Sequence, residues 1–141
     1  MRLHLALTAA ILAAAAAFSV RALGEPGALV CGGIGADERA RLAEETRGAN
    51  LALELFIAKR GDYVAGADVT VQPLDGTGHG IEASADGPIC YIELPPGRYR
   101  IEAEFNGVTR SARAIVREHA RRPVRVALAF PEEAARGDLG P

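Results

Sequence analysis

The sequence predicts an all-β protein: a seven-stranded antiparallel β-sandwich of the prealbumin or immunoglobulin type, preceded by a signal peptide and one short α-helix. Short runs in which apolar and polar residues alternate recur from residue 51 to residue 130, roughly 8 to 14 residues apart. Clusters of Gly, Pro, Asn and Asp separate these runs. The turns are tight, whereas parallel strands need long crossover connections, so the pattern excludes a parallel sheet.

The clearest strand follows a Pro95-Pro96-Gly97 corner. Apolar and charged residues alternate over residues 98–105, which predicts a strand with one apolar and one charged face. Asn106-Gly107 follows, and this dipeptide is typical of a tight hairpin.

The other six predicted strands show the same alternation less regularly; they are 51–58, 67–73, 81–85, 89–94, 108–116 and 124–130. The sandwich domain is therefore expected over residues 50–131. Residues 132–141, rich in Ala, Glu and Gly, are expected to form a flexible tail. Before the sandwich, residues 25–49 hold a Gly-rich segment and a short helix, with Asp37 as the expected N-cap and Gly48 as its terminator.

The first 24 residues have the pattern of a secretory signal peptide. A weakly positive start precedes an apolar run from Leu5 to Phe18, and the small residues Ala22 and Gly24 suit cleavage after Gly24. Cleavage after Ala17 or Ala22 also fits. An uncleaved anchor, a buried helix and lipidation at Cys31 are the alternatives. The prediction is a periplasmic or secreted protein with no stable membrane insertion after cleavage.

Cys31 and Cys90 are the only cysteines. An even pair in an exported chain predicts a disulfide, and closing a loop of roughly 60 residues stabilises a small domain by about 4 kcal/mol. The alternative is two separate buried residues. Two cysteines without a His or carboxylate cluster fall short of a tetrahedral zinc site, so no metal is expected.

Charge is distributed unevenly along the chain. The 16 Lys and Arg against 18 Asp and Glu give −2, and without the two arginines of the signal peptide the balance is 14 − 18 = −4. Residues 98–141 are locally basic, with 9 bases and 6 acids. A nucleic-acid site would need a dense basic patch with aromatic residues, which this alternating pattern does not offer. Most of the arginines are interpreted as solvated strand faces. Five form a candidate partner-binding face: Arg98, Arg100, Arg110, Arg113 and Arg125.

A resemblance narrows the fold. The run Gly66-Ala67-Asp68-Val69-Thr70-Val71, followed about 25 residues later by Leu94-Pro95-Pro96-Gly97-Arg98-Tyr99-Arg100-Ile101, resembles the carboxypeptidase regulatory-like domains. Those domains are related to transthyretin and to the collagen-adhesin B-type repeats. The chain also resembles small exported bacterial proteins of unassigned function. The resemblance implies a prealbumin-like sandwich with an accessory or adhesive role and no chemistry of its own.

Residues that could perform catalysis are sparse. The hydroxyisourate hydrolase, an enzyme with the same fold, uses clustered His and Arg and a C-terminal Tyr-Arg-Gly-Ser, whereas this chain has only His79 and His119 beyond its signal peptide. Glu102 and Glu104 lie on one side of a predicted strand, about 7 Å apart, and the neighbouring arginines favour cross-strand ion pairs over acid–base catalysis. No catalytic or cofactor-binding residue is predicted, and no cofactor.

These observations favour a non-enzymatic module of the cell envelope that binds an unknown protein partner through a strand edge or the basic face. The alternative is a hydrolase or ligand-binding oligomer of the transthyretin type with its site at a subunit interface. The oligomeric state stays open at this point.

Overall fold

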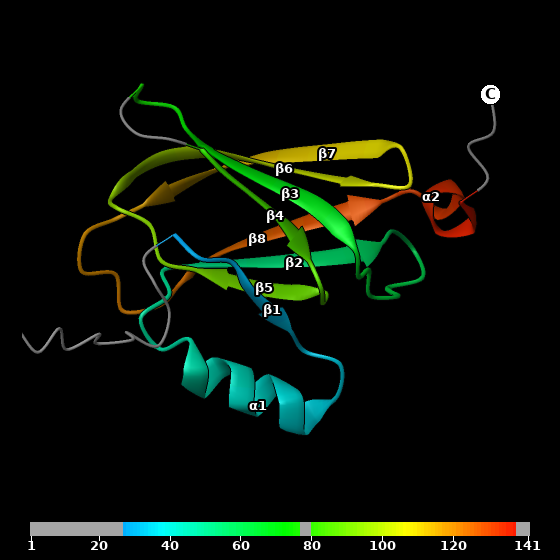
Figure 1. The fold of residues 1–141 in the computed structure, drawn as a ribbon, viewed down its shortest axis with the longest axis horizontal. Coiled ribbons are helices and arrows are strands. Elements are labelled where there is room, and N and C mark those ends of the chain that lie inside the picture. The colour runs from blue at the N-terminus through cyan, green and yellow to red at the C-terminus, as the bar shows by residue number, and fades with distance from the viewer. Residues whose placement is uncertain (1–26, 77–79, 138–141) are drawn as a thin grey trace, which may run out of the picture.

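Two four-stranded β-sheets pack face to face in the computed structural model, which describes residues 27–76 and 80–137 (Figure 1). The first sheet has the strand order β1 (Val30–Gly32), β5 (Ile89–Ile92), β2 (Leu51–Ile57) and β8 (Val124–Phe130). The second sheet has the order β4 (Ile81–Ala85), β3 (Ala67–Pro73), β6 (Gly97–Phe105) and β7 (Val108–Val116). The helices are α1 (Ala36–Glu45) and α2 (Glu132–Arg136).

The predicted β-sandwich is confirmed in outline, but the described residues form eight strands and not seven. The additional strand is β1, which pairs antiparallel with β5 over Val30↔Tyr91 to Gly32↔Ile89. Its three residues are too few to show an alternating pattern, so the sequence gives no strand signal there. The segment 25–49, expected to precede the sandwich, therefore contributes an edge strand to it.

The prediction of a purely antiparallel fold is wrong at one pair of strands. β2 and β8 pair in parallel along their whole length, from Leu51↔Val124 to Ile57↔Phe130. Tight turns constrain only strands that are consecutive in the sequence. The chain between β2 and β8 includes the whole second sheet and provides the long crossover that a parallel pair needs.

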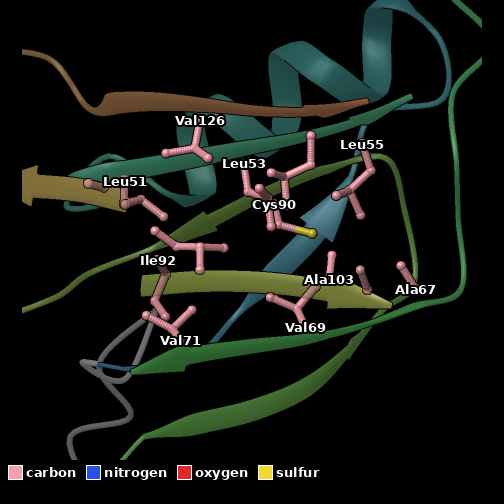
Figure 2. Packing of buried hydrophobic residues seen from close by; sticks show 14 of the residues in the cluster. Leu51, Leu53, Leu55, Ala67, Val69, Val71, Cys90, Ile92, Ala103 and Val126 are labelled. Carbon is pink, nitrogen blue, oxygen red and sulfur yellow. The ribbon is translucent and has the colours of Figure 1, made fainter. Parts of the chain in front are cut away.

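The core lies between the two sheets. Leu51, Leu53 and Leu55 of β2 point toward Val69 and Val71 of β3, and all five are buried (Figure 2). Leucine and valine side chains at alternate positions fill the space between the sheets, which is the arrangement that the period of two predicts. Burial of this apolar surface is the main stabilising contribution to such a domain.

Helix α1 lies on the outer side of the first sheet and contacts β1 (Figure 1). Leu42 is its only buried residue. The expected N-cap at Asp37 is wrong, because Gly35 occupies the cap position and Asp37 stands in the first turn. Glu38 instead accepts a hydrogen bond from the Ile34 N–H at 3.1 Å, which ties the Gly-rich loop to the helix.

The C-terminal segment differs from the expected flexible tail. Residues 132–136 form α2, whose Ala134 is fully buried. Asn106, in the hairpin between β6 and β7, donates a hydrogen bond from Nδ2 to the Ala134 carbonyl at 2.6 Å. The helix therefore closes one end of the sandwich.

Two predictions fall on residues outside the described part of the chain: the signal peptide at 1–24, with an uncleaved anchor or a buried helix as its alternatives, and the last four residues of the tail. The lipidation alternative concerned Cys31, whose sulfur is bonded to Cys90. Within the described ranges, no helix is long and apolar enough to cross a membrane.

Candidate protein-interaction face

A disulfide joins Cys31 to Cys90, with an S–S distance of 2.11 Å, as the cysteine pair predicts. The two residues lie directly opposite each other in the β1–β5 register. Beside them, Gly87 approaches the backbone of Gly32 so closely that a Cβ at Gly87 would lie 2.6 Å from the Gly32 Cα. The bond and this contact together fix the N-terminal segment on the first sheet.

The Pro95-Pro96-Gly97 corner is held by side chains from both sides. The Tyr99 hydroxyl donates a hydrogen bond to the Pro95 carbonyl. Asn50 accepts from the Leu94 N–H at 2.9 Å and donates to the Leu94 carbonyl at 2.7 Å. Burial raises the pKa of the Tyr99 hydroxyl, and the charge of Asp75 adds to the effect. The corner therefore gives β6 a fixed starting point and a fixed register.

The outward side chains of the second sheet form a mostly polar surface, here called the charged face. Its residues alternate along each strand with residues that face the first sheet, and most of them are exposed. The face consists of Glu82 and Ser84 of β4, Asp68, Thr70 and Gln72 of β3, Arg98, Arg100, Glu102 and Glu104 of β6, and Thr109, Ser111, Arg113 and Ile115 of β7.

The strand register places like charges opposite each other on the charged face. Asp68 pairs with Glu104 between β3 and β6, and Arg100 pairs with Arg113 between β6 and β7. Thr70 has Glu82 on one side and Glu102 on the other. The face therefore has an acidic end (Asp68, Glu82, Glu102, Glu104) and a basic end (Arg98, Arg100, Arg113).

Among the described residues, Glu102 and Glu104 do not form the expected cross-strand ion pairs. Arg100 contacts Glu102 along the same strand, with Nε 3.2 Å from Oε1. Glu104 lies opposite Asp68 and makes no salt bridge within the described residues. The sequence shows which side of β6 the charges occupy, but only the pairing of β6 with its neighbours shows which charges meet.

Arg98 is the most constrained arginine of the basic end. Its Nη2 lies 2.8 Å and its Nε 3.1 Å from Asp75 Oδ1, and its backbone N–H donates to Asp75 Oδ2 at 3.3 Å. The side-chain hydrogen bond from Arg98, followed by the backbone one, holds the pKa of the Asp75 carboxyl below its usual value.

The structure divides the five arginines of the candidate face between two sheets. Arg98, Arg100 and Arg113 share the basic end of the charged face. Arg110 lies on the opposite side of β7, and its Nε donates to the Ala129 carbonyl of β8 at 3.1 Å. Arg125 belongs to the first sheet, where its Nη2 is 2.6 Å from Glu54 Oε1. The five therefore do not make one basic surface.

Residues that sequence reasoning missed are Asn50, Asp68 and Asp75. Asn50 and Asp75 stand alone in turns and carry no pattern, whereas Asp68 sits on a recognisable strand and becomes informative only through its register with Glu104. Within the described ranges, no group of three His, Cys, Asp or Glu side chains is placed to hold a metal ion.

Comparison with known proteins adds no family. No protein-family model matches the chain, and no curated protein matches it.

Proposed function

We propose that this chain is a non-enzymatic exported module of the cell envelope that binds a protein through the charged face of its second sheet. The observation that carries the proposal is the register of that face. Asp68 lies opposite Glu104 and Arg100 lies opposite Arg113. Like charges directly opposite each other destabilise a sheet, so this arrangement costs the isolated domain stability. A partner with complementary charges would compensate that cost.

A protein suits this face better than a nucleic acid does. The face carries both signs of charge, and its acidic end would repel a phosphate backbone. Rigid strands hold the side chains in fixed rows. Charged groups in fixed rows favour one orientation of a partner over others and speed its association.

The disulfide supports an exported location. Such bonds persist in oxidising compartments and are rare in the cytosol. The apolar run at residues 5–18 and the small residues before position 25 agree with this proposal. The resemblance of the Pro-Pro-Gly-Arg-Tyr corner to carboxypeptidase regulatory-like domains supports an accessory role.

The location is tested by the intact mass of the protein recovered from expressing cells. A chain that begins at Glu25 and weighs two hydrogens less than its reduced form supports export. An uncut or lipidated chain, or one with free thiols, contradicts this part of the proposal.

The binding role is tested by capture from an envelope extract of the source cells, with three immobilised proteins compared. These are the unmodified chain, Arg113→Glu on the charged face and Arg121→Glu on an exposed loop as matched control. We expect the captured protein to be lost with Arg113→Glu and retained with Arg121→Glu. Equal capture by all three, or none by any, contradicts binding through this face.

A further inference from the structure

We infer that the protein bound by the charged face is a second copy of this chain, stacked face to face about a two-fold axis that runs across the strands. This inference rests on the proposed function and names the partner. Its basis is the way in which the charges are sorted over the second sheet.

The sign of the charge changes along the strands and not across them. On β6, Arg98 and Arg100 come first, and Glu102 and Glu104 follow. The neighbouring strands keep the same division. Arg113 lies beside Arg100, and Asp68 lies beside Glu104. The boundary between the two ends therefore crosses the middle of the face, between positions 100 and 102 of β6.

A symmetric dimer uses the same surface on both copies, so that surface must be complementary to itself. A two-fold axis parallel to the strands would put the acidic end of one copy on the acidic end of the other. A two-fold axis perpendicular to the strands, through the boundary on β6, reverses their direction. It brings each basic end over an acidic end. Charge complementarity thus selects one of the two ways of stacking the sheets.

In this dimer Arg100 faces Glu102 of the second copy, and Arg98 faces Glu104 of the second copy. The symmetry forms each contact twice. Arg98 and Glu104 are six residues apart on β6, about 20 Å, so the contacts at the two ends do not compete for space. At the basic end Ile115, which is 55% exposed, adds an apolar side chain to the contact.

The ion pairs within one copy do not prevent this association. Arg98–Asp75 and Arg100–Glu102 are exposed pairs, and exposed pairs rearrange at small cost. Among the described residues, Glu104 makes no salt bridge, so its charge is available for Arg98 of the second copy.

The size of the face indicates a weak dimer. Four strands at about 4.8 Å spacing and a length of about 20 Å give a contact below the standard size of a specific interface. Because its attraction is mainly between exposed charges, salt screens it. We therefore expect the dissociation constant to rise at least about tenfold between about 20 mM and about 500 mM NaCl.

Analytical ultracentrifugation of the disulfide-bonded chain over a range of concentrations at low salt tests the inference. Arg100→Glu should weaken the dimer at least about tenfold, and the double variant Arg100→Glu/Glu102→Arg should restore it, because the charges then face each other in reverse. Arg121→Glu is the control and should dimerise like the unmodified chain. Circular dichroism checks that each variant is folded.

A second ultracentrifugation experiment mixes two variants, neither of which should dimerise alone. Arg98→Glu/Arg100→Glu makes the outward row of β6 wholly acidic, and Glu102→Arg/Glu104→Arg makes that row wholly basic. We expect each to be monomeric alone and the two to form a one-to-one complex when mixed.

A chain that stays monomeric at low salt and high concentration overturns the inference, as does a dimer that persists in Arg98→Glu/Arg100→Glu. Neither result contradicts the proposed function, in which some protein binds the charged face. That proposal still stands if an envelope protein is captured by the unmodified chain and lost with Arg113→Glu.

Discussion

Charged side chains are arranged differently on the outer sides of the two sheets. On the first sheet, Arg125 and Glu54 form an ion pair across β8 and β2, and α1 covers the outer side at β1. On the second sheet, the register sets Asp68 against Glu104 and Arg100 against Arg113. The first sheet also carries the disulfide. The charges of the first sheet are matched within it, whereas on the second sheet Asp68, Glu104 and Arg113 make no salt bridge within the described residues.

Under the proposed function, stability and binding fall to separate layers of a small sandwich. A surface whose charges are matched internally gains nothing from a charged partner. A surface whose like charges are adjacent gains from one. The following variants test this division between the layers, in decreasing order of the change in stability that we expect.

Removal of the disulfide should have the largest effect on the first sheet. We expect Cys31→Ser/Cys90→Ser to lower the free energy of unfolding by about 4 kcal/mol, because the bond closes a long loop in the unfolded chain. Urea titration of the variant and the unmodified chain measures the difference. Adding a reductant should change the unmodified chain alone. A loss below about 1 kcal/mol would show that the bond does not dominate the stability of this layer.

The close approach between β1 and the turn before β5 should tolerate no added side chain. In Gly87→Ala the new Cβ would lie 2.6 Å from the Gly32 Cα and 2.7 Å from its N and O atoms. We expect a loss of about 1 to 3 kcal/mol in urea titration, as for other overpacked sites. Gly48→Ala is the control, because its Cβ meets only the flexible end of Glu93 at 3.3 Å. Equal stability of the two variants would contradict the contact.

The corner that begins β6 depends on one hydroxyl group. Tyr99→Phe removes the hydrogen bond to the Pro95 carbonyl and should cost about 1 kcal/mol in thermal or chemical unfolding. Tyr91→Phe serves as the control, since no hydrogen bond of the Tyr91 hydroxyl occurs within the described residues. If Tyr99→Phe and Tyr91→Phe lower the free energy of unfolding equally, the Tyr99 hydroxyl does not hold the corner.

Neutralising one carboxylate on each sheet should change stability in opposite directions. Glu104→Gln removes the repulsion from Asp68, so it should stabilise the monomer by a few tenths of a kcal/mol. Glu54→Gln removes the ion pair with Arg125, so it should destabilise the monomer by about a few tenths of a kcal/mol. Urea midpoints at low salt, at concentrations where the chain is monomeric, measure both. Shifts of the same sign would refute the contrast between the two layers.

The smallest effect concerns pH and the Arg98–Asp75 contact. The folded-state pKa of Asp75 lies below its unfolded value of 3.8. Its stabilising contribution is therefore complete above that value and is lost as the pH falls through the lowered pKa. We expect the melting temperatures of the unmodified chain and Asp75→Asn to converge as the pH falls from about 6 to about 2. A difference that grows toward acid pH would reverse the assigned sign.

Much of the fold could be predicted from local patterns. Alternation marks β6 and β7, the Pro-Pro-Gly corner and Asn106-Gly107 mark where they begin and turn, and an even cysteine count indicates the bond. The sequence could not show β1, because three residues have no period. It could not show the parallel pairing of β2 with β8 either, because contact between distant segments leaves no local signal.

The candidate site was predictable only in part. The charged side of β6 is visible as Arg98, Arg100, Glu102 and Glu104 in alternate positions. Which of these residues meet like charges depends on the register with β3 and β7, and register is a property of the assembled sheet. Arg110 is three positions from Arg113 on β7, so the period of two alone already places the two on opposite sides of that strand. The assignment of Arg125 to the other sheet, in contrast, depends on the pairing of β8 with β2.

The parallel pairing of β2 with β8 also has a consequence for the order of folding. Leu51 at the start of β2 cannot pair with Val124 until β8 has been synthesised. The last residue of β8, Phe130, is also among the largest fully buried side chains of the core. Contacts between such distant residues slow folding, because a long loop must close before they form. During synthesis, one side of β2 therefore has no neighbouring strand until β8 has emerged from the ribosome. A chain truncated before β8 should remain unfolded, with the apolar side of β2 accessible to chaperones.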